Sequence, residues 1–423
     1  MKGEYTVKTK ALRLYGKNDL RLEEFELPKI TDDEILAEVV TDSICMSSYK
    51  AAYQGGDHKR VPDNVAENPI IIGHEFCGVI REVGANWKNK FKEGQKFSIQ
   101  PALNWQGSLD ALGYSYQNIG GCATYVVIPV EVMLTNSLLD YNGDAYFYGS
   151  LSEPMSCIVG GYHAFFHTKS GSYEHEMGIR DGGNLIIMAG AGPMGLGAVD
   201  YAVHGPRKPK LVVVTDIDDT RLERAKTLLT PEDAEKNGVK LVYVNTNTCG
   251  DAKEYLMNLT DGHGYDDVLL MAPVKPVCEL GDSVLAYDGC VNFFAGPTDH
   301  EFSAMVNFYN IHYNATHYVG TSGGNTDDMK ESLALMESGK LNPAVMITHV
   351  GGIDSAKDST LNLPSIKGGK KLIYTHVNMP LTAIDDFAEL GKTDPFFARL
   401  AEITARNNGL WCAEAEKFLL ENK

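Results

Sequence analysis

Residues 184–216 read NLIIMAGAGPMGLGAVDYAVHGPRKPKLVVVTD, and this stretch decides the fold of the second half of the chain. An apolar run at 184–190 ends in glycine and leads into a segment with helical periodicity, and a second apolar run follows at 210–216. Further apolar runs alternate with helical stretches at 241–245, 266–272, 290–296 and 317–322. The alternation predicts an α/β domain with a doubly wound parallel sheet and helices on both faces.

The turn after the first of these strands carries the motif GxGxxG, from Gly190 to Gly195. Gly190 permits the tight turn, Gly192 lets the backbone approach a pyrophosphate, and Gly195 allows the helix to pack closely on the strand. Pro193 and Met194 lie where the helix begins, and its free N–H groups attract phosphates. We therefore predict that all five residues bind a dinucleotide, although a glycine turn without a ligand is the alternative.

Asp216 ends the second strand, about 20 residues after the last glycine of the motif, as a dinucleotide-binding unit requires. A carboxylate at this place accepts hydrogen bonds from the ribose hydroxyls and repels a 2′-phosphate. The sequence therefore favours NAD(H). Arg221 lies on the following helix and would soften this preference, so NADP(H) stays open as a second possibility.

The first part of the chain shows a different sequence pattern, without alternating strands and helices. Short strand-like segments separated by Gly, Pro, Asn and Asp are found at 11–16, 34–40, 78–84, 95–101 and 123–129. Closely spaced short strands of this kind predict a β-barrel-like domain. The helical tail from about residue 380 is assigned to the same domain, which makes that domain discontinuous. Three polar or glycine-rich segments are interpreted as loop insertions: 53–68, 101–121 and 351–371.

Composition narrows the class of protein. A chain of 423 residues is long enough for two or three domains. The net charge of -18 repels phosphate backbones and acidic lipids, which disfavours nucleic acid and membrane partners. The N-terminus has no secretory pattern and no apolar run could span a bilayer. The eight cysteines form no CxxC pair, which disfavours a disulfide framework. These features predict a cytoplasmic protein that acts on a small molecule.

Three separated segments carry side chains that zinc accepts as ligands. Cys45 lies in CMSS, His74 and Glu75 follow an apolar run in GHE, and Glu153 precedes a proline. Thiolate, imidazole and carboxylate are the usual zinc ligands in proteins. Spacing alone does not show that they meet in space, because each one taken singly could be a buried core residue.

The stretch GHEFCGVIREVG at 73–84 is very similar to the GHE motif of zinc-containing medium-chain alcohol and polyol dehydrogenases. The resemblance implies a GroES-like catalytic domain at 1–163 and 323–423, with a Rossmann NAD(P)-binding domain at 164–322. It also implies a catalytic zinc held by Cys45, His74, Glu75 and Glu153. A glutamate in the setting Leu-Ser-Glu-Pro resembles the polyol branch. Whether Glu75 and Glu153 bind zinc at the same time stays open.

The same resemblance suggests how the reaction would proceed. Zinc would act as a Lewis acid on the substrate oxygen while hydride moves to or from the nicotinamide. Ser47 stands where relatives carry a proton-relay hydroxyl, and Lys50 could continue the relay or be a surface lysine. Many relatives hold a structural zinc with four cysteines, but here the matching segment has only Cys122, so one catalytic zinc is predicted. Relatives are usually dimers or tetramers, which suggests a homodimer or homotetramer.

Four longer stretches resemble bacterial L-sorbose-1-phosphate reductases: 10–16, 45–78, 171–179 and 200–206. This implies interconversion of L-sorbose 1-phosphate and D-glucitol 6-phosphate. A phosphate requires cations or backbone donors, and His58, Lys59 and Arg60 lie between the Cys45 and His74 segments. They are candidate substrate ligands or, equally, a basic surface turn.

A second basic patch is interpreted as a solvated surface, and it consists of Lys367, Lys370 and Lys371. Two other functions stay open. One is a dehydrogenase of an unphosphorylated polyol such as sorbitol or threitol. The other is a zinc-free binding or regulatory protein with the same fold.

Overall fold

The computed structural model describes residues 6–423. The chain forms two compact units, one made of Met1–Glu153 and Ile347–Lys423, the other of Pro154–Met346. The predicted boundaries, after residues 163 and 322, lie near the end of helix α3 (Tyr146–Ala164) and ahead of helix α10 (Thr326–Glu337). Both of these points fall within the second unit, where Asp328 of α10 lies 2.8 Å from His163 of α3.

The first unit is built on an eight-stranded sheet in the order β19-β17-β18-β3-β5-β6-β8, with β7 also paired to β3. Its strands are β3 (Ile35–Ile44), β5 (Phe76–Val83), β6 (Lys96–Ile99), β7 (Tyr125–Ile128), β8 (Leu138–Asp140), β17 (Ile347–Gly352), β18 (Lys370–Tyr374) and β19 (Thr382–Ala383). A second sheet in the order β2-β1-β4 consists of β1 (Lys8–Gly16), β2 (Asp19–Glu26) and β4 (Ile70–Ile71). Two short helices of this unit are α1 (Met46–Gln54) and α2 (Val130–Leu134).

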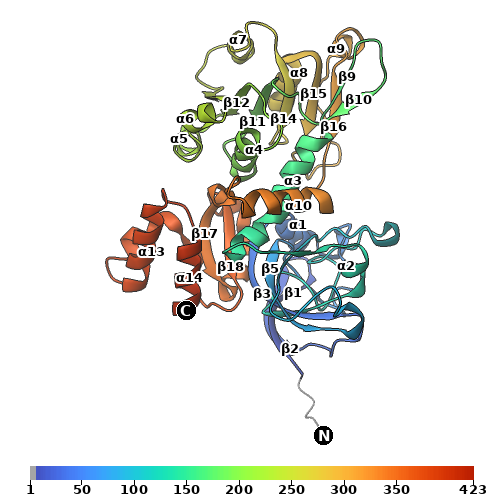
Figure 1. Ribbon diagram of the computed structural model, residues 1–423, viewed down its shortest axis with the longest axis vertical. Coiled ribbons are helices and arrows are strands. Elements are labelled where there is room, and N and C mark those ends of the chain that lie inside the picture. Colours follow the sequence, from blue (N-terminus) through green and yellow to red (C-terminus); the bar gives the residue numbers. More distant parts are fainter. Residues whose placement is uncertain (1–5) are drawn as a thin grey trace. The chain divides into compact units, whose positions relative to one another are not determined.

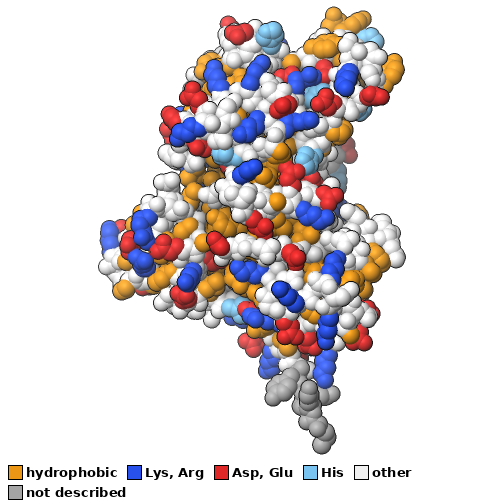
Figure 2. Space-filling view, in the orientation of Figure 1, with side chains coloured by type: hydrophobic (Ala, Val, Ile, Leu, Met, Phe, Trp, Pro, Cys, Tyr) orange, Lys and Arg blue, Asp and Glu red, His pale blue; other side chains and the backbone are white. Residues whose placement is uncertain are grey.

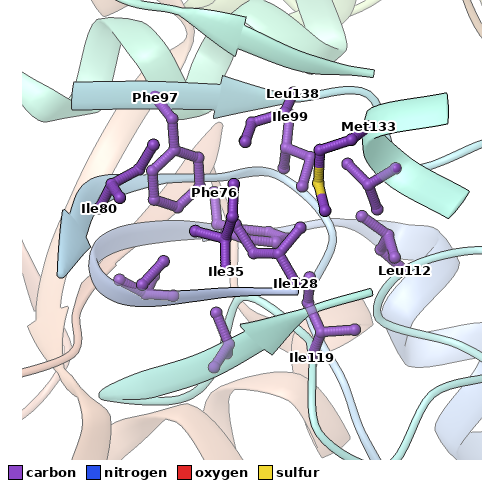
Figure 3. Packing of buried hydrophobic residues seen from close by; sticks show 14 of the residues in the cluster. Ile35, Phe76, Ile80, Phe97, Ile99, Leu112, Ile119, Ile128, Met133 and Leu138 are labelled. Carbon is purple, nitrogen blue, oxygen red and sulfur yellow. The ribbon is translucent and has the colours of Figure 1, made fainter. Parts of the chain in front are cut away.

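A buried apolar cluster fills the space between these strands. Figure 3 shows Phe76 of β5 and Phe97 of β6 among branched aliphatic side chains such as Ile35 and Ile80. The two phenylalanine rings meet edge to face, with centroids 6.2 Å apart, an arrangement that aromatic pairs prefer. The sequence reaches this packing because the apolar positions of neighbouring strands point to the same side of the sheet. The cluster gives the segment around His74 a rigid support.

The segment at 351–371, predicted to be a loop insertion, is not a loop. It contains the end of β17, helix α11 (Ala356–Leu361) and the start of β18, which pairs in parallel with β17 and antiparallel with β3. The prediction was wrong because the lysines of β18 suggested exposure, whereas all five residues of this strand are buried. The helical tail follows as α12 (Phe387–Leu390), α13 (Pro395–Arg406) and α14 (Ala413–Asn422), within the first unit as expected.

The second unit is built on a six-stranded, all-parallel sheet in the order β13-β12-β11-β14-β15-β16. The strands are β11 (Asn184–Met188), β12 (Leu211–Asp216), β13 (Lys240–Asn245), β14 (Tyr265–Leu270), β15 (Leu285–Phe293) and β16 (His317–Gly320). The helices between and after them are α4 (Pro193–His204), α5 (Asp219–Leu228), α6 (Pro231–Lys236), α7 (Ala252–Asn258), α8 (Lys275–Ser283), α9 (Phe308–Tyr313) and α10. A hairpin of β9 (Phe166–Thr168) and β10 (His175–Met177) precedes the sheet.

The order of the strands reverses at β11, with β12 on one side of it and β14 on the other (Figure 1). Right-handed crossovers from such a starting strand place the connecting helices on opposite faces of the sheet. The predicted fold class is therefore confirmed: a doubly wound Rossmann sheet and a second domain of the GroES-like, β-barrel type. No helix of residues 6–423 is long and apolar enough to cross a membrane. Figure 2 shows acidic and basic side chains mixed over the visible face.

Candidate active site

The glycine turn lies between β11 and α4 in the second unit. A Cβ on Gly195 would come within 2.1 Å of the Gly190 carbonyl oxygen, so only glycine lets the helix approach this closely. A Cβ on Gly192 would meet nothing within 4 Å, which leaves open space at the start of α4, where a phosphate can approach the backbone. The residue of the turn with a left-handed backbone is Ala189, whose φ is 54°. Position 190 requires glycine for a different reason: a Cβ there would crowd Ile187.

Asp216 ends β12 beside this turn. Its carboxylate accepts hydrogen bonds from the backbone N–H groups of Ala191, at 3.3 Å, and Ile217, at 2.8 Å. The acid therefore ties the glycine turn to the second strand, and it is nearly buried. Arg221 lies on α5, where its backbone N–H is capped by Asp218 and its guanidinium is exposed to solvent. Pro193 and Met194 form the first turn of α4.

In the first unit, the structure brings Cys45, His74 and Glu75 together. One potential ligand atom from each residue lies within 4.8 Å of the other two. Cys45 follows β3 and precedes α1, whereas His74 and Glu75 connect β4 to β5. Gly73 must be glycine here, since its φ is 93° and a Cβ would lie 2.3 Å from the buried carboxylate of Asp42.

The imidazole of His74 is held at both nitrogens. Nδ1 lies 3.2 Å from the hydroxyl of Ser48, and Nε2 lies 3.3 Å from the hydroxyl of Tyr114. Hydrogen bonding at a ring nitrogen fixes the orientation of the imidazole, as is usual for a metal-binding histidine. Tyr114 is buried, and its ring centroid lies 4.8 Å from that of His74.

Glu75 is paired with a buried lysine. Its carboxylate accepts hydrogen bonds from the Lys370 ammonium and the Ser43 hydroxyl. Burial opposes ionisation of Glu75, but the charge of Lys370, followed by that of His74, outweighs it and lowers the pKa. Glu75 is therefore an anion with partners at both oxygens. The interpretation of Lys370 and Lys371 as a solvated patch was wrong, because both side chains are buried in β18.

Glu153, on α3, is not one of the three residues whose ligand atoms lie within 4.8 Å of one another, but its carboxyl group interacts electrostatically with all three. Its pKa is raised to about 7, chiefly by burial; the charge of His74 lowers the pKa, those of Glu75 and Cys45 raise it, and that of Lys370 lowers it. Burial likewise raises the pKa of the Cys45 thiol. A bound divalent cation favours the ionised forms of Cys45 and Glu153, which burial disfavours, and thiolate, imidazole and carboxylate are zinc ligands. The donor set of this site therefore fits zinc.

The predicted relay residues lie on α1. The hydroxyl of Ser47 is 2.9 Å from the sulfur of Cys45 and also hydrogen-bonds Tyr114. Lys50 is half-buried, and its charge contributes to lowering the pKa of His58. Ser47 thus lies next to the candidate ligands, whereas Lys50 belongs to a group of cations described next.

This group of cations consists of Lys50, Lys59 and Arg60, and the His58 ring lies among them. Burial, followed by the charges of Arg60, Lys59 and Lys50, lowers the pKa of His58 to about 4. The His58 ring stacks on Tyr114 with centroids 5.7 Å apart, and the Arg60 guanidinium carbon lies 5.7 Å from the same ring centroid. Within residues 6–423, Lys59 and Arg60 form no ion pair with a carboxylate. Tyr114 is thus shared by the cationic group and the candidate metal site.

Sequence reasoning missed Tyr114, Ser43 and Ser48 and gave Lys370 the wrong environment. Ser48 could have been found, since it lies three residues after Cys45 on the first turn of a helix. Tyr114 lies 40 residues from His74 and Lys370 lies 295 residues from Glu75, and no local pattern marks either of them.

The chain matches two family models, "Alcohol dehydrogenase GroES-like domain" over residues 31–136 and "Zinc-binding dehydrogenase" over residues 193–338. It is 51% identical to the L-sorbose 1-phosphate reductase of Klebsiella pneumoniae, over 97% of each chain. It is 52% identical to the mannitol-1-phosphate 5-dehydrogenase of Aliivibrio fischeri, over 98% of this chain and 97% of that one.

Among solved structures, the chain resembles the 2R,3R-butanediol dehydrogenase of Bacillus subtilis, with a TM-score of 0.69 and 20% identity. The alignment covers 87% of this chain and all of the other, and it supports the fold. The first family model falls within the first unit and the second within the second unit. The chain therefore belongs to the zinc-dependent medium-chain dehydrogenases, in the branch that contains polyol and polyol-phosphate dehydrogenases, and is an oxidoreductase that uses a nicotinamide cofactor.

Proposed function

We propose that this enzyme interconverts a ketose phosphate and the corresponding polyol phosphate, with L-sorbose 1-phosphate and D-glucitol 6-phosphate as the first pair to test. The observation that carries the proposal is the cationic group of Lys50, Lys59 and Arg60 around the uncharged His58 ring, which reaches the metal-site residues through Tyr114. A chain with a net charge of -18 repels an anionic substrate in general, so a local group of cations beside the site has a clear use.

Arg60 is the best suited of these cations. Its guanidinium has no carboxylate partner in residues 6–423, and a guanidinium binds phosphate through two parallel hydrogen bonds. Lys59 is exposed and would act as a point charge. The name of the Klebsiella relative supports a sugar phosphate as substrate, and so does that of the Aliivibrio relative.

At the reacting carbon, we propose Cys45, His74, Glu75 and Glu153 as the groups that hold zinc. When bound, zinc supplies a Lewis acid for the substrate oxygen. Ser48 fixes the His74 ring through Nδ1, and Lys370 keeps Glu75 ionised. Ser47 is in position to pass a proton between the substrate oxygen and the next group of a relay, which Lys50 could continue.

The test is to compare kcat/KM for L-sorbose 1-phosphate with that for L-sorbose, in the wild type and in Arg60→Met. We expect a strong preference for the phosphorylated sugar in the wild type. Loss of a charged hydrogen-bond donor should raise KM for the phosphorylated sugar about 10- to 100-fold and leave L-sorbose unaffected.

Lys88→Met is the matched control, because it removes one exposed positive charge from the segment after β5. It should leave both substrates unchanged. Equal rates on the two sugars, unaffected by Arg60→Met, would instead favour an unphosphorylated polyol as substrate. A wild type that prefers fructose 6-phosphate would match the name of the Aliivibrio relative.

We propose NAD(H) as the preferred cofactor, because Asp216 stands at the end of β12, where a carboxylate accepts hydrogen bonds from a ribose and repels a 2′-phosphate. NADP(H) is the alternative, because the Arg221 guanidinium is exposed and would be able to bind a 2′-phosphate. Its nearest carboxylate is that of Asp218, at 3.9 Å.

We also propose a homodimer or homotetramer. β16 ends the six-stranded sheet, and within residues 6–423 its outer edge has no partner strand. Large apolar side chains are exposed on the neighbouring α9, among them Phe308, at 77%. Exposed strand edges and apolar patches are places where subunits pair. Light scattering coupled to gel filtration tests this directly, and a mass of one chain would contradict it.

A further inference from the structure

Tyr114 belongs to the segment at 101–121, where many relatives place the cysteines of a structural zinc. In this chain the segment instead folds against the metal site. Gly113 has φ 75°, and a Cβ there would lie 2.0 Å from the Gly73 carbonyl oxygen and 3.1 Å from Cβ of His74. The backbone before Tyr114 is thus pressed onto the GHE segment, which directs the tyrosine side chain toward His74.

The hydroxyl of Tyr114 lies beside the candidate metal ligands. It is 3.3 Å from Nε2 of His74, and it hydrogen-bonds Ser47, which in turn is 2.9 Å from the Cys45 sulfur. Ser48 holds Nδ1 of His74, and we take Nε2, on the side of Tyr114, as the nitrogen that would bind the metal. Once Nε2 binds metal, it no longer accepts a hydrogen bond, and the buried hydroxyl of Tyr114 needs another acceptor.

The aromatic ring of Tyr114 contacts His58 and Arg60, the residues proposed to bind phosphate. One face is covered by the His58 ring at an interplanar angle of 8°, and the Arg60 guanidinium lies near the same ring. The loop also holds Arg60 through its backbone, because the Ser115 hydroxyl donates to the Arg60 carbonyl at 2.7 Å. Tyr114 therefore links the group that would bind phosphate to the group that would bind the reacting oxygen.

We propose that Tyr114 is a substrate-contacting residue with two separable roles. Its hydroxyl donates a hydrogen bond to the substrate oxygen beside His74, and its ring holds His58 and Arg60 in place for the phosphate. The inference rests on the proposed function, since the second role has a purpose only if the substrate carries a phosphate.

Tyr114→Phe separates the roles, because it removes the hydroxyl and keeps the ring. We expect kcat/KM to fall about 10- to 100-fold, by the same factor for L-sorbose 1-phosphate and for L-sorbose. The zinc content and the inhibition constant of inorganic phosphate should stay at the wild-type values. Activity within about twofold of the wild type would overturn the first role, and so would loss of zinc.

Tyr114→Leu removes the ring as well. It should show the same loss and, in addition, raise the inhibition constant of inorganic phosphate about tenfold. Combining it with Arg60→Met should give less than the product of the two single effects on this constant, because both changes disable the same phosphate contact. Independent effects on the phosphate constant, or none for Tyr114→Leu, would overturn the second role. If Tyr114→Leu does not fold, Tyr114→Trp takes its place, because it keeps an aromatic surface. This variant should leave the inhibition constant of inorganic phosphate near the wild-type value. A tenfold rise in that constant would overturn the second role.

The control is Tyr116→Phe, two residues along the same segment. Tyr116 is half-buried against the apolar cluster of the barrel and contacts none of the candidate metal ligands in the described chain. It should match the wild type in every measurement. If the wild type showed no preference for the phosphorylated sugar, the proposed function would fail; if the preference held and Tyr114→Phe were fully active, only this inference would fail.

Discussion

Lys370 and Glu75 form an ion pair in which the lysine side chain is 6% exposed and the glutamate side chain 1%. The pair connects the strand β18 to the residue that follows His74. Two charges removed from water are stable only as partners, so each holds the other ionised. Burial opposes the charge of Lys370, yet Glu75, followed by Cys45, outweighs it and raises the pKa of the ammonium. Lys370 is accordingly a fixed positive charge beside the candidate zinc ligands.

Replacing Lys370 with methionine should therefore destabilise the protein. The change leaves Glu75 buried without its cation, and we expect the free energy of unfolding of the first unit to fall by about 3–5 kcal/mol. Urea unfolding at pH 7.5 measures this, with zinc content determined in parallel.

The exposed Lys367→Met is the control and should change little. The double variant Lys370→Met/Glu75→Gln should recover part of the loss, because it removes both charges. A double variant no more stable than the single one would show that the lysine acts through packing alone.

Cys45→Ser should reduce the zinc content from about one ion per chain to nearly none, because a hydroxyl is a poor replacement for a thiolate ligand. Turnover should fall at least about 1000-fold, given that a Lewis acid contributes several kcal/mol to such a reaction. Binding of NAD(H), followed by fluorescence, should persist. Cys249→Ser, in the second unit, should retain both zinc and turnover, and normal turnover in Cys45→Ser would refute the metal assignment.

Asp216→Ala should raise KM for NAD about tenfold or more, since a charged acceptor of ribose hydrogen bonds is lost. KM for NADP should rise less or fall, because the same change removes repulsion of a 2′-phosphate. Initial rates with both cofactors decide the matter. An equal rise for both would mean that Asp216 acts only by holding the glycine turn through the N–H group of Ala191.

His163 should make the stability of the second unit depend on pH. Hydrogen bonds to Asp328, then to Glu331, raise its pKa from 6.5 to about 9. The folded state therefore binds the proton more tightly than the unfolded state. The stabilisation is complete below pH 6.5 and is lost as pH rises through about 9.

The check is the difference in thermal midpoint between the wild type and His163→Gln. It should be largest at pH 6 and shrink toward pH 9.5. Since the side chain is 47% exposed, solvent screening keeps the effect modest. The exposed His300→Gln should show no such trend, and a constant difference for His163→Gln would refute the assignment.

Much of the fold could be predicted because it follows from local patterns. The apolar runs and glycines of the second half mark six strands of one sheet, and every predicted strand from 184 to 320 is present. The short strands in the first part of the chain could also be predicted from the sequence. β18 was not, because its two lysines are buried by partners that lie far away in the sequence.

In the candidate site, too, residues in local motifs could be predicted, whereas residues placed by long-range contacts could not. Cys45, His74 and Glu75 stand in recognisable local settings, and the structure brings them together. Tyr114 and Lys370 acquire their positions from tertiary contacts, the first from a loop pressed against Gly73 and the second from strand pairing with β3. Chemistry that depends on such long-range contacts leaves no periodic signal in the sequence.

The 295-residue separation between Glu75 and Lys370 has a consequence for synthesis on the ribosome. The second unit is one continuous stretch and can finish its sheet while the first still lacks β17 and β18. Until the last eighth of the chain emerges, Glu75 has no lysine to neutralise it. We expect the nucleotide-binding unit to mature first during translation, and the cluster of zinc ligands to reach its final form only when the polypeptide is nearly complete.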